Sequence, residues 1–401
     1  MINPEYNILK DWMFGKLNIL LENLDPNPSY SILKMSLGEP TLSMPEFVKH
    51  KLSLSNEWGK YPPSTAIPEL SNSILQYIGR RHLGAENIIN KNKNIVPVPG
   101  TREPLHLVGL LAKNTKVGET TAIVTNPFYH AWRAGSISSG SKIYWLNALA
   151  ENDYLPNISN IPEKILDTTV IMYICSPSNP HGGIASLNYL KNAILLARKH
   201  NFILAIDECY GDIYRLNKTK PPGGLDAALS LGDNLDNIIV FNSLSKRSNA
   251  CGIRAGFIAG DEKIIDSYKL LVSNGASPVP IPIQKVAAAL YDDEDHNTKA
   301  CLHYDQNFQI VEKYLKPFYK DFKIPGGGFF LWLKVDNDEE AAKILWNKFS
   351  LRVMPGRYMA KDVDGLNPGK GYLRISIVDN KDVIEEAMKR ISLFLQVKYT
   401  K

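Results

Sequence analysis

Cysteine is scarce in this chain, and none of its four cysteines forms a CxxC pair. The wide spacing argues against a disulfide framework and against a structural zinc site, and it fits a reducing compartment. Stretches of roughly 18 apolar residues, which a membrane span needs, are also missing. The N-terminus has no continuous apolar core of a secretory signal. We therefore expect a cytoplasmic protein without a metal site or a membrane partner. The four cysteines are Cys175, Cys209, Cys251 and Cys301.

Runs of like charge are absent as well. The 46 basic and 41 acidic residues are interspersed and leave a net charge of +5. Nucleic-acid-binding tails need blocks of one sign, and no zinc-finger, helix-turn-helix or RNA-binding signature occurs, so we expect no nucleic-acid partner. A length of 401 residues with 44% hydrophobic content is typical of two domains, or of one large domain with a smaller one appended.

Short apolar runs alternate with helical patterns from about residue 65 to 290. Most of these runs lack polar alternation, which is typical of strands buried on both faces of a parallel sheet. The stretch 187–201 has the apolar spacing of a crossover helix. The predicted strands are "TAIVTN" (121–126), "VIMYICSP" (170–177), "FILAIDECY" (202–210), "NIIVFNSLS" (237–245) and "AGFIAGD" (255–261).

The two ends of the chain differ from this central part. Apolar residues at helical spacing from Leu9 to Leu24 predict an amphipathic N-terminal helix. Beyond about residue 291 the sequence predicts a smaller α+β unit. Its elements are a long helix, the strands "GGGFFLWLKV" (326–335) and "GYLRISIV" (371–378), and helices near 338–349 and 381–397.

Polar side chains follow three of the predicted strands, in "SPSNP" (176–180), "DECY" (207–210) and "SLSK" (243–246). Ligands of open α/β sheets bind beyond the carboxyl ends of the strands. An amine held in such a pocket, here that of Lys246, can form a Schiff base with an aldehyde, as pyridoxal phosphate enzymes require. A lysine considered alone is far more often a solvated surface residue.

The other groups that a pyridoxal site needs have candidates nearby. Asp207 ends an apolar strand and could pair with a protonated pyridine nitrogen, although alone it would more often cap a helix. Asn179 and Tyr210 could hydrogen-bond the phenolic oxygen, and Tyr129, with Trp132 close in sequence, could stack on the ring. Singly, these are more often turn or core residues.

A phosphate group also has candidate donors. The stretch "VPVPGTREPLHLVGLL" (96–111) reads as a strand, a Gly-Thr turn and a helix, whose N-terminal amides can bind an anion. Hydroxyl groups and a guanidinium further along the chain could add to them. The candidates are Gly100, Thr101, Arg102, Ser243, Ser245 and Arg254.

The order GTR, NPFY, SPSNP, DECY, SLSK and Arg254 resembles the fold-type I pyridoxal phosphate enzymes, and more narrowly the class I/II aminotransferases. The resemblance extends from "LGEP" (37–40) to "GYLRIS" (371–376). It implies an α/β fold with a mostly parallel seven-stranded sheet flanked by helices and a smaller α+β domain. We expect residues 1–45 as a helix and arm joining the small domain, 46–284 as the cofactor-binding domain, and 285–401 as the small domain.

The resemblance assigns roles to these residues. It implies that Lys246 holds the cofactor and moves the proton of the substrate's Cα, while Asp207, Asn179 and Tyr210 contact the pyridoxal ring as proposed above. Arg374, which alone would more often face solvent, is implied to bind the substrate's α-carboxylate.

Three further contacts are implied by the same resemblance. The Gly38 backbone and Asn179 help to bind the substrate beside Arg374. Tyr61 reaches the cofactor phosphate of the neighbouring subunit, so we expect a homodimer with shared active sites.

Stretches such as "SLSKRSN", "PGTREPL" and "YPPSTAIPEL" look like the succinyldiaminopimelate aminotransferases of bacterial lysine and cell-wall biosynthesis. This implies ping-pong transfer of an amino group from glutamate to N-succinyl-2-amino-6-ketopimelate. Cys251 and His181 depart from that subgroup, which usually has proline and threonine there.

Other functions remain open. The chain could be another amino-acid aminotransferase, of the aspartate or LL-diaminopimelate type, or a β C–S lyase with the same cofactor site. A cofactor-binding regulator is disfavoured because no DNA-binding segment is appended. Spacing cannot decide which arginine would bind a second carboxylate of the substrate. The candidates are Arg80, Arg81, Arg102, Arg133, Arg247 and Arg357.

Overall fold

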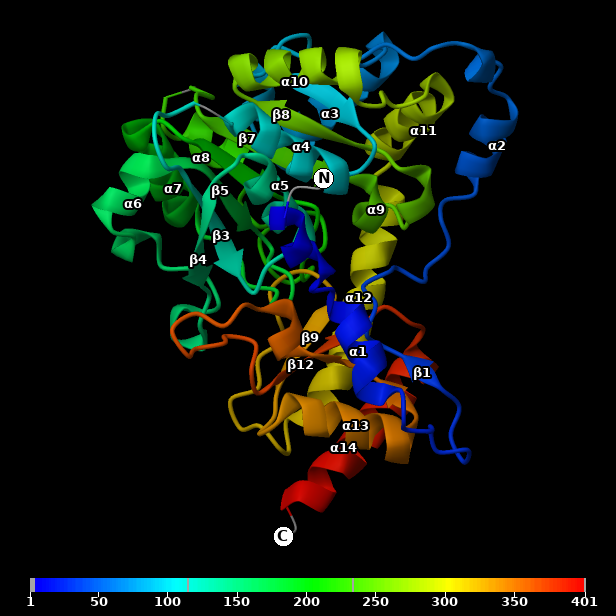
Figure 1. Cartoon of the computed structure of the whole chain (residues 1–401). Helices are drawn as coiled ribbons and strands as arrows, with labels where there is room; N and C mark the ends of the chain where they lie inside the picture. The colour runs from blue at the N-terminus through cyan, green and yellow to red at the C-terminus, as the bar shows by residue number, and fades with distance from the viewer. Residues whose placement is uncertain (1–3, 114, 233, 400–401) are drawn as a thin grey trace.

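The computed structural model describes residues 4–113, 115–232 and 234–399. Figure 1 shows a large unit built around one sheet and a smaller unit below it. The large sheet has the strand order β2-β8-β7-β6-β5-β3-β4. β8 is antiparallel to both neighbours and the other pairs are parallel, which confirms the predicted mostly parallel seven-stranded α/β fold. The strands are β2 (Ile95–Val98), β3 (Thr121–Asn126), β4 (Lys142–Asn147), β5 (Thr169–Cys175), β6 (Ile203–Asp207), β7 (Ile238–Ser243) and β8 (Gly256–Gly260).

β4 has no counterpart among the strands predicted from the sequence. It lies at the edge of the sheet, where it pairs with β3 alone. Most of its residues, "KIYWLN", are partly exposed, unlike the fully buried residues of β3 and β5. β4 therefore lacks the continuous apolar run by which the central strands are recognised.

Helices cover both faces of the sheet. Alternate side chains of β5 point to opposite faces: Met172 and Ile174 join one apolar core, while Ile171 and Tyr173 join the other. Burial on both faces explains why the strands lack polar alternation. The first core includes α3 (Pro68–Arg81), α7 (Leu187–His200), α8 (Gly224–Leu229) and α11 (Ile281–Asp292); the second includes α4 (Arg102–Ala112), α5 (His130–Ser138) and α10 (Glu262–Gly275).

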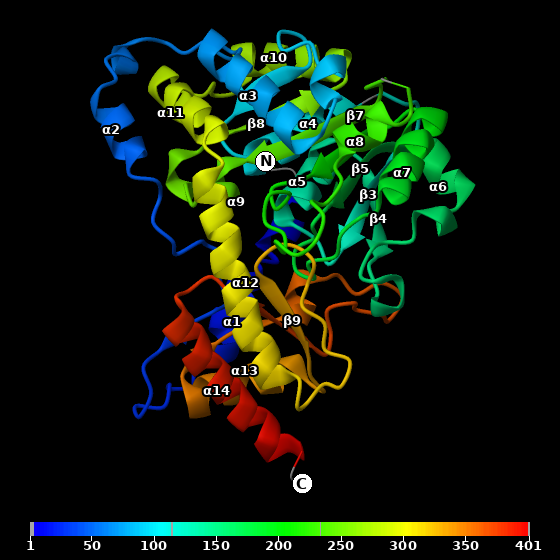
Figure 2. The same cartoon turned by 180° about the vertical axis from the view of Figure 1, so that it is seen from behind.

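The small unit contains the antiparallel sheet β11-β12-β9 with three helices. Figure 2 shows α12 running from the large unit into the small one. Tyr304 of this helix lies in a core of the large unit, and Phe308 lies in the core of the small unit. The elements are β9 (Phe330–Lys334), β11 (Met354–Pro355), β12 (Tyr372–Ser376), α12 (Asp295–Leu315), α13 (Asp338–Phe349) and α14 (Lys381–Tyr399).

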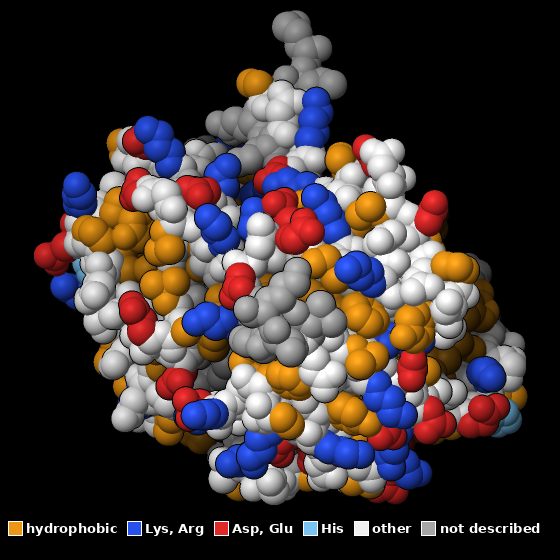
Figure 3. All heavy atoms as spheres, turned by 90° about the horizontal axis from the view of Figure 1, so that it is seen from below, with side chains coloured by type: hydrophobic (Ala, Val, Ile, Leu, Met, Phe, Trp, Pro, Cys, Tyr) orange, Lys and Arg blue, Asp and Glu red, His pale blue; other side chains and the backbone are white. Residues whose placement is uncertain are grey.

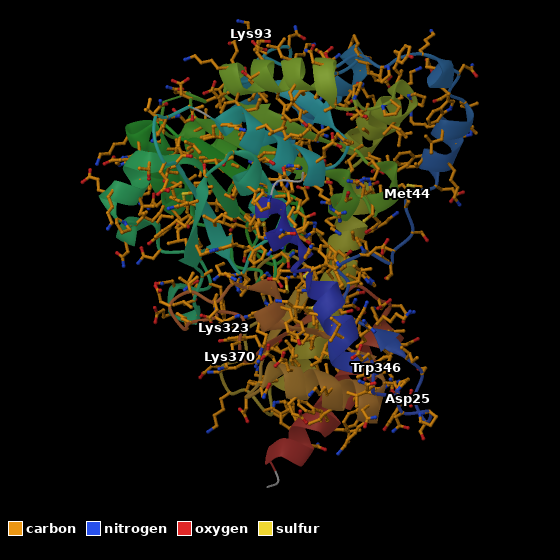
Figure 4. The ribbon with its side chains drawn as sticks, in the orientation of Figure 1. Asp25, Met44, Lys93, Lys323, Trp346 and Lys370 are labelled. Carbon is orange, nitrogen blue, oxygen red and sulfur yellow. The ribbon has the colours of Figure 1, made fainter. Side chains whose placement is uncertain are left out.

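The N-terminal segment packs against the small unit. The predicted helix is wrong at its start, because a 3-10 helix (Pro4–Lys10) precedes α1 (Met13–Leu21). Farther along, β1 (Leu33–Lys34) pairs in parallel with β10 (Leu351–Arg352). Trp346 Nε1 donates a hydrogen bond of 2.7 Å to the carbonyl of Leu24, and Figure 4 shows Trp346 and Asp25 at this edge of the small unit.

α11 packs with α3 in the core of the large unit. The predicted boundary at 284 lies within α11, and the buried residues of this helix beyond 284, from Val286 to Tyr291, still belong to a core of the large unit. The domain boundaries as such stay a prediction.

The remaining α-helices are α2 (Phe47–Ser53), α6 (Glu163–Thr168) and α9 (Leu244–Arg247).

The surface has no field of a single charge on the face seen in Figure 3, where basic and acidic side chains are interspersed. Among the helices of the described ranges, none is long and apolar enough to cross a membrane.

Candidate active site

A cavity of about 950 Å³ is lined by residues of both units, including residues that follow the carboxyl ends of β3, β5, β6 and β7. The structure brings nearly all of the predicted site residues together there, as expected for an open α/β sheet. Only Gly100 and Tyr61 are not part of its wall. The predicted residues that line the cavity are Gly38, Thr101, Arg102, Tyr129, Asn179, Asp207, Tyr210, Ser243, Ser245, Lys246, Arg254 and Arg374.

Lys246 lies on the single turn of α9, directly after β7. Ser243 caps this turn by accepting a hydrogen bond of 3.2 Å from the Ser245 amide. The Lys246 Nζ donates to the carbonyl of Gly38 at 2.6 Å. A Cβ at Gly38 would collide with the Phe330 ring, so glycine allows this close approach of the N-terminal segment.

Asp207 at the end of β6 is a buried carboxylate, 3% exposed. It accepts a hydrogen bond of 3.2 Å from the Cys209 amide but forms no ion pair with a residue of the described ranges. Burial raises the pKa of Asp207 to about 6, more than the hydrogen bonds from Cys209 lower it. A buried carboxylate is costly until a cation pairs with it, so this position suits a positively charged ligand group.

Tyr210 and Asn179 lie on the same wall. Tyr210 is buried, and its ring packs edge-on against Phe329 with centroids 5.4 Å apart. Burial raises the pKa of the Tyr210 hydroxyl, so this group stays protonated and can donate a hydrogen bond. Asn179 accepts a hydrogen bond from Arg374 and keeps its amide hydrogens available.

The candidate phosphate donors converge at the start of α4. Thr101 precedes the first helical residue, Arg102, so the amides of this turn have no partner within the helix. Arg254 donates to Ser245 Oγ at 3.3 Å and to the carbonyl of Pro99 at 2.9 Å. Gly100 adopts a left-handed φ of 74°, and a Cβ there would collide with the Arg254 guanidinium. Gly100 therefore shapes this anion site without lining the cavity.

Arg374 on β12 is 3% exposed. Its Nη2 donates to the carbonyl of Ser36 at 2.7 Å, its Nη1 donates to Asn179 Oδ1 at 3.2 Å, and its guanidinium stacks on Phe330. Its Nε has no hydrogen-bond partner in the described ranges. Burial lowers the pKa of Arg374 to about 10, so the group is still a cation at neutral pH and can bind a carboxylate.

Tyr129 precedes α5, and its hydroxyl accepts a hydrogen bond of 3.1 Å from Arg102 Nε. Trp132 is buried nearby and also lines the cavity. Tyr61 is fully exposed and lies outside the cavity wall. Its predicted contact with a second subunit stays a prediction.

Most of the arginines left open by the sequence are bound to other groups. Arg81 and Arg247 both pair with the buried Asp212 at 3.1 Å, and Arg357 pairs with Asp338 at 2.7 Å. Arg80 pairs loosely with Glu294 and donates to a main-chain carbonyl. Of the six candidates, only Arg102 and Arg133 line the cavity.

One wall of the cavity was not predicted from the sequence. Residues 11–14 of the N-terminal segment line it, together with Lys34 and Arg352 of the β1–β10 pair. Among them, only Trp12 and Met13 belonged to a pattern noted in the sequence, the amphipathic spacing of the predicted N-terminal helix. Of the two departures from the subgroup, Cys251 lines the cavity, whereas the buried His181 stacks on Tyr154 outside it.

The fold and this arrangement of lysine, aspartate and phosphate donors define a pyridoxal phosphate enzyme of fold type I. The family model for aminotransferase class I and II matches residues 30–391. The chain therefore belongs to the class I and II aminotransferase family, and pyridoxal phosphate is its cofactor.

Individual relatives agree with this family. The aminotransferase of Neisseria meningitidis is 32% identical, with a TM-score of 0.93 over 98% of this chain and 100% of that chain. Aminotransferase AspB of Helicobacter pylori is 28% identical, with a TM-score of 0.87 over 99% of both chains. An LL-diaminopimelate aminotransferase of Dehalococcoides mccartyi is 26% identical over 90% of this chain and 91% of the relative.

The residues present fit this cofactor. Asp207 is a buried carboxylate that pairs with no cation of the described residues, so it can accept the charge of a pyridinium. The start of α4, Ser245 and Arg254 form a cradle for a dianion, which a Cβ at Gly100 would obstruct. Lys246 lines the same cavity and supplies the amine.

Proposed function

We propose that this enzyme transfers an amino group from glutamate to N-succinyl-2-amino-6-ketopimelate by a ping-pong mechanism. The observation that carries this proposal is the surplus of cations on the cavity wall. Besides Arg374, the wall includes Arg102, Arg133, Arg352 and Lys34. An acceptor with three carboxylates needs more cations than one arginine. Motifs such as "SLSKRSN" and "PGTREPL" resemble those of the succinyldiaminopimelate aminotransferases, which supports the same substrate.

We assign the chemistry as follows. Bound pyridoxal phosphate supplies an electron sink that makes the proton on the substrate's Cα removable. Lys246 holds the cofactor and then takes that proton with its Nζ. Arg374 orients the substrate by its α-carboxylate, helped by the Gly38 backbone and Asn179. Asp207 keeps the ring nitrogen charged.

The remaining residues hold the cofactor in this proposal. Asn179 and Tyr210 hydrogen-bond its phenolic oxygen, and Tyr129 packs on its ring. The phosphate group is bound by main-chain and side-chain donors. These are Gly100, Thr101, Arg102, Ser243, Ser245 and Arg254.

A homodimer with shared active sites belongs to the same proposal. Leu54, Trp58 and Tyr61 lie close together in sequence and are exposed by 64%, 56% and 102% of their reference areas. Exposed apolar side chains in one segment are typical of an interface. Sedimentation of the holoenzyme at several concentrations tests this assembly.

A second candidate is the LL-diaminopimelate aminotransferase reaction. It is favoured by the name of the relative from Dehalococcoides mccartyi, which matches over nearly the whole chain at 26% identity. LL-diaminopimelate has a second ammonium group near its far carboxylate, so it calls for an anion on the cavity wall, where Asp11 and Glu39 are available.

A panel of substrates separates these functions. Glutamate is offered as donor with N-succinyl-2-amino-6-ketopimelate, oxaloacetate or pyruvate, and LL-diaminopimelate is offered as donor with 2-oxoglutarate. We expect the succinylated acceptor to give the highest kcat/KM. Preference for LL-diaminopimelate would select the second candidate. Release of pyruvate and ammonia from cystathionine without any keto acid would identify a β C–S lyase instead.

A further inference from the structure

Arg133 is a buried arginine in the wall of the active-site cavity. It lies in the first turn of α5, four residues after the cap Tyr129, and only 2% of it is exposed. Its guanidinium stacks on Phe128 with 4.9 Å to the ring centroid. Packing on a ring fixes the plane of the guanidinium, so its nitrogens have defined directions.

The hydrogen bonds of Arg133 are incomplete. Nη2 donates to the main-chain carbonyl of Asp11 at 2.9 Å. Nη1 is 3.7 Å from Asp11 Oδ2, which is an ion pair but too long for a hydrogen bond. Nε is buried and has no acceptor in the described ranges. A buried guanidinium with unused donors is costly, and a carboxylate that accepts from it would remove this cost.

The surroundings of Arg133 are positive. His130 lies three residues before Arg133 on α5 and also lines the cavity. Its pKa is lowered to about 4, mainly by burial and further by the charges of Arg102 and Arg133. The imidazole is therefore neutral at neutral pH and does not compete for an anion. Two guanidinium groups thus act on this part of the cavity, and one carboxylate, that of Asp11, faces Arg133.

Asp11 is bound more closely to another residue than to Arg133. Its Oδ1 forms a short ion pair with Lys16, and its carboxylate is about one third exposed. Asp11 belongs to the N-terminal segment, which Figure 1 shows passing α5 on its way to the small unit. Trp12 next to it packs edge-on against His130 with centroids 4.9 Å apart. The segment thus brings an acidic side chain to Arg133 without completing its hydrogen bonds.

We propose that Arg133 binds the second carboxylate of the substrate, and that the Asp11 carboxylate occupies this position in the free enzyme. The site takes the class of α-amino and α-keto acids with a carboxylate at the far end of the chain. This inference rests on the proposed function, because Arg374 is assigned there to the α-carboxylate. Arg133 on α5 and Arg374 on β12 line the same cavity from different units.

The other cations of the wall suit this role less well. Arg102 is exposed and already donates to Tyr129. Lys34 is exposed, and Arg352 is partly exposed and donates to Asn18. Exposed cations pair weakly with carboxylates because water competes, whereas a buried guanidinium with free donors gains most from an anion.

The test compares two inert ligands on the pyridoxal phosphate holoenzyme. Glutarate has carboxylates at both ends, and pentanoate is a chain of the same length with only one. Titration calorimetry measures both affinities. We expect the wild type to bind glutarate at least about tenfold more tightly than pentanoate. Arg133→Gln should weaken glutarate at least about tenfold and leave pentanoate within about twofold.

Two further variants sharpen the test. Arg133→Lys keeps the charge but not the planar fork, and we expect it to recover only part of the lost glutarate affinity. Asp11→Asn removes the competing carboxylate, so we expect glutarate to bind about threefold more tightly with pentanoate unchanged. Arg198→Gln, at the protein surface, is the control for a lost charge. Cofactor absorbance and the melting temperature verify that each variant is folded.

Several outcomes would overturn the inference. They are an unchanged glutarate preference in Arg133→Gln, loss of that preference in Arg352→Gln instead, or unchanged or weaker glutarate binding in Asp11→Asn. Failure of the proposed function looks different, because the wild type would then not convert glutamate with any acceptor of the panel. An enzyme that uses glutamate while Arg133→Gln keeps its ligand preference would refute the role of Arg133 alone.

Discussion

Asp207 and Asp212 are two buried aspartates that lie five residues apart, 3% and 5% exposed, yet their pKa values move in opposite directions. Burial raises the pKa of Asp207 to about 6. Burial also acts to raise the pKa of Asp212, but Arg247 and Arg81 outweigh it and lower that pKa. The difference between the two is the number of cations that the chain itself supplies.

The same contrast separates the neighbours Lys246 and Arg247. Lys246 lines the cavity and donates only to a main-chain carbonyl. Arg247 is 1% exposed and pairs with Asp212 and Glu294. Arg247 of α9 shares Asp212 with Arg81 of α3 and donates to the Leu290 carbonyl of α11, so its contacts join α9 to both helices. Arg247 therefore contributes to the fold, although it directly follows the lysine of the cavity wall.

The largest expected effect is the loss of turnover in Lys246→Ala. Because the proposed function has Nζ hold the cofactor and move a proton, we expect turnover to fall at least about a thousandfold. The melting temperature of the apoenzyme should change little, since Nζ has one hydrogen bond. Steady-state assays and the visible absorbance of bound cofactor measure this, with the exposed Lys199→Ala as control. A fully active Lys246→Ala variant would refute the assignment.

Asp212→Asn should cost the most stability. The substitution leaves two buried guanidinium groups, those of Arg81 and Arg247, without their shared carboxylate. Breaking a buried ion pair costs about 3–5 kcal/mol, which denaturation of the apoenzyme measures. The exposed Asp167→Asn is a matched control and should change the free energy of unfolding by less than about 1 kcal/mol. Equal changes in the free energy of unfolding for both variants would contradict the role of Asp212 as the shared partner of two buried arginines.

Asp207→Asn should have the opposite effect on the apoenzyme. A carboxyl whose pKa is raised in the folded state destabilises the fold above that pKa, because the charged form is buried. We expect Asp207→Asn apoenzyme to be more stable than wild type at pH 7 by about 2–3 kcal/mol. This advantage should disappear as the pH falls from about 6 towards 4, where the wild-type carboxyl takes up its proton in the folded protein. The holoenzyme should show the reverse, with weaker cofactor binding in the variant.

Arg374→Lys tests an unpaired cation of the cavity. Lysine keeps the charge but loses the planar fork that donates to Asn179 and Ser36. We expect KM for glutamate to rise about tenfold or more with a smaller change in kcat, since the α-carboxylate is bound less well in all states. Arg357→Lys, whose guanidinium pairs with Asp338 outside the cavity, should leave KM within about twofold. A KM that stays constant in Arg374→Lys would contradict the assignment.

Tyr61→Phe should have the smallest effect. Tyr61 is fully exposed within one chain, so its hydroxyl contributes nothing to the stability of that chain. If it reaches the cofactor phosphate of a second subunit, the variant should release the cofactor about threefold to tenfold faster at an unchanged apoenzyme melting temperature. Gel filtration of apoenzyme and holoenzyme, followed by absorbance, measures this. Identical release rates would show that Tyr61 makes no such contact.

Much of the fold and the site could be predicted from the sequence. The five strands predicted as buried apolar runs coincide with β3, β5, β6, β7 and β8, because strands buried on both faces are continuous apolar runs. Residues directly after those strands, such as Asn179 and Lys246, therefore had to meet at one edge of the sheet. The edge strand β4 escaped prediction because its residues are partly exposed.

The sequence by itself determined the cofactor end of the site, because strand ends and the turn before α4 lie close together in any sheet of this order. Only the tertiary structure decided which arginines are free. Arg81, Arg133 and Arg247 look alike in the sequence, yet two of them share Asp212 and the third faces the cavity with an unused nitrogen. Pairing depends on contacts between distant segments, and the spacing of residues along the chain contains no record of them.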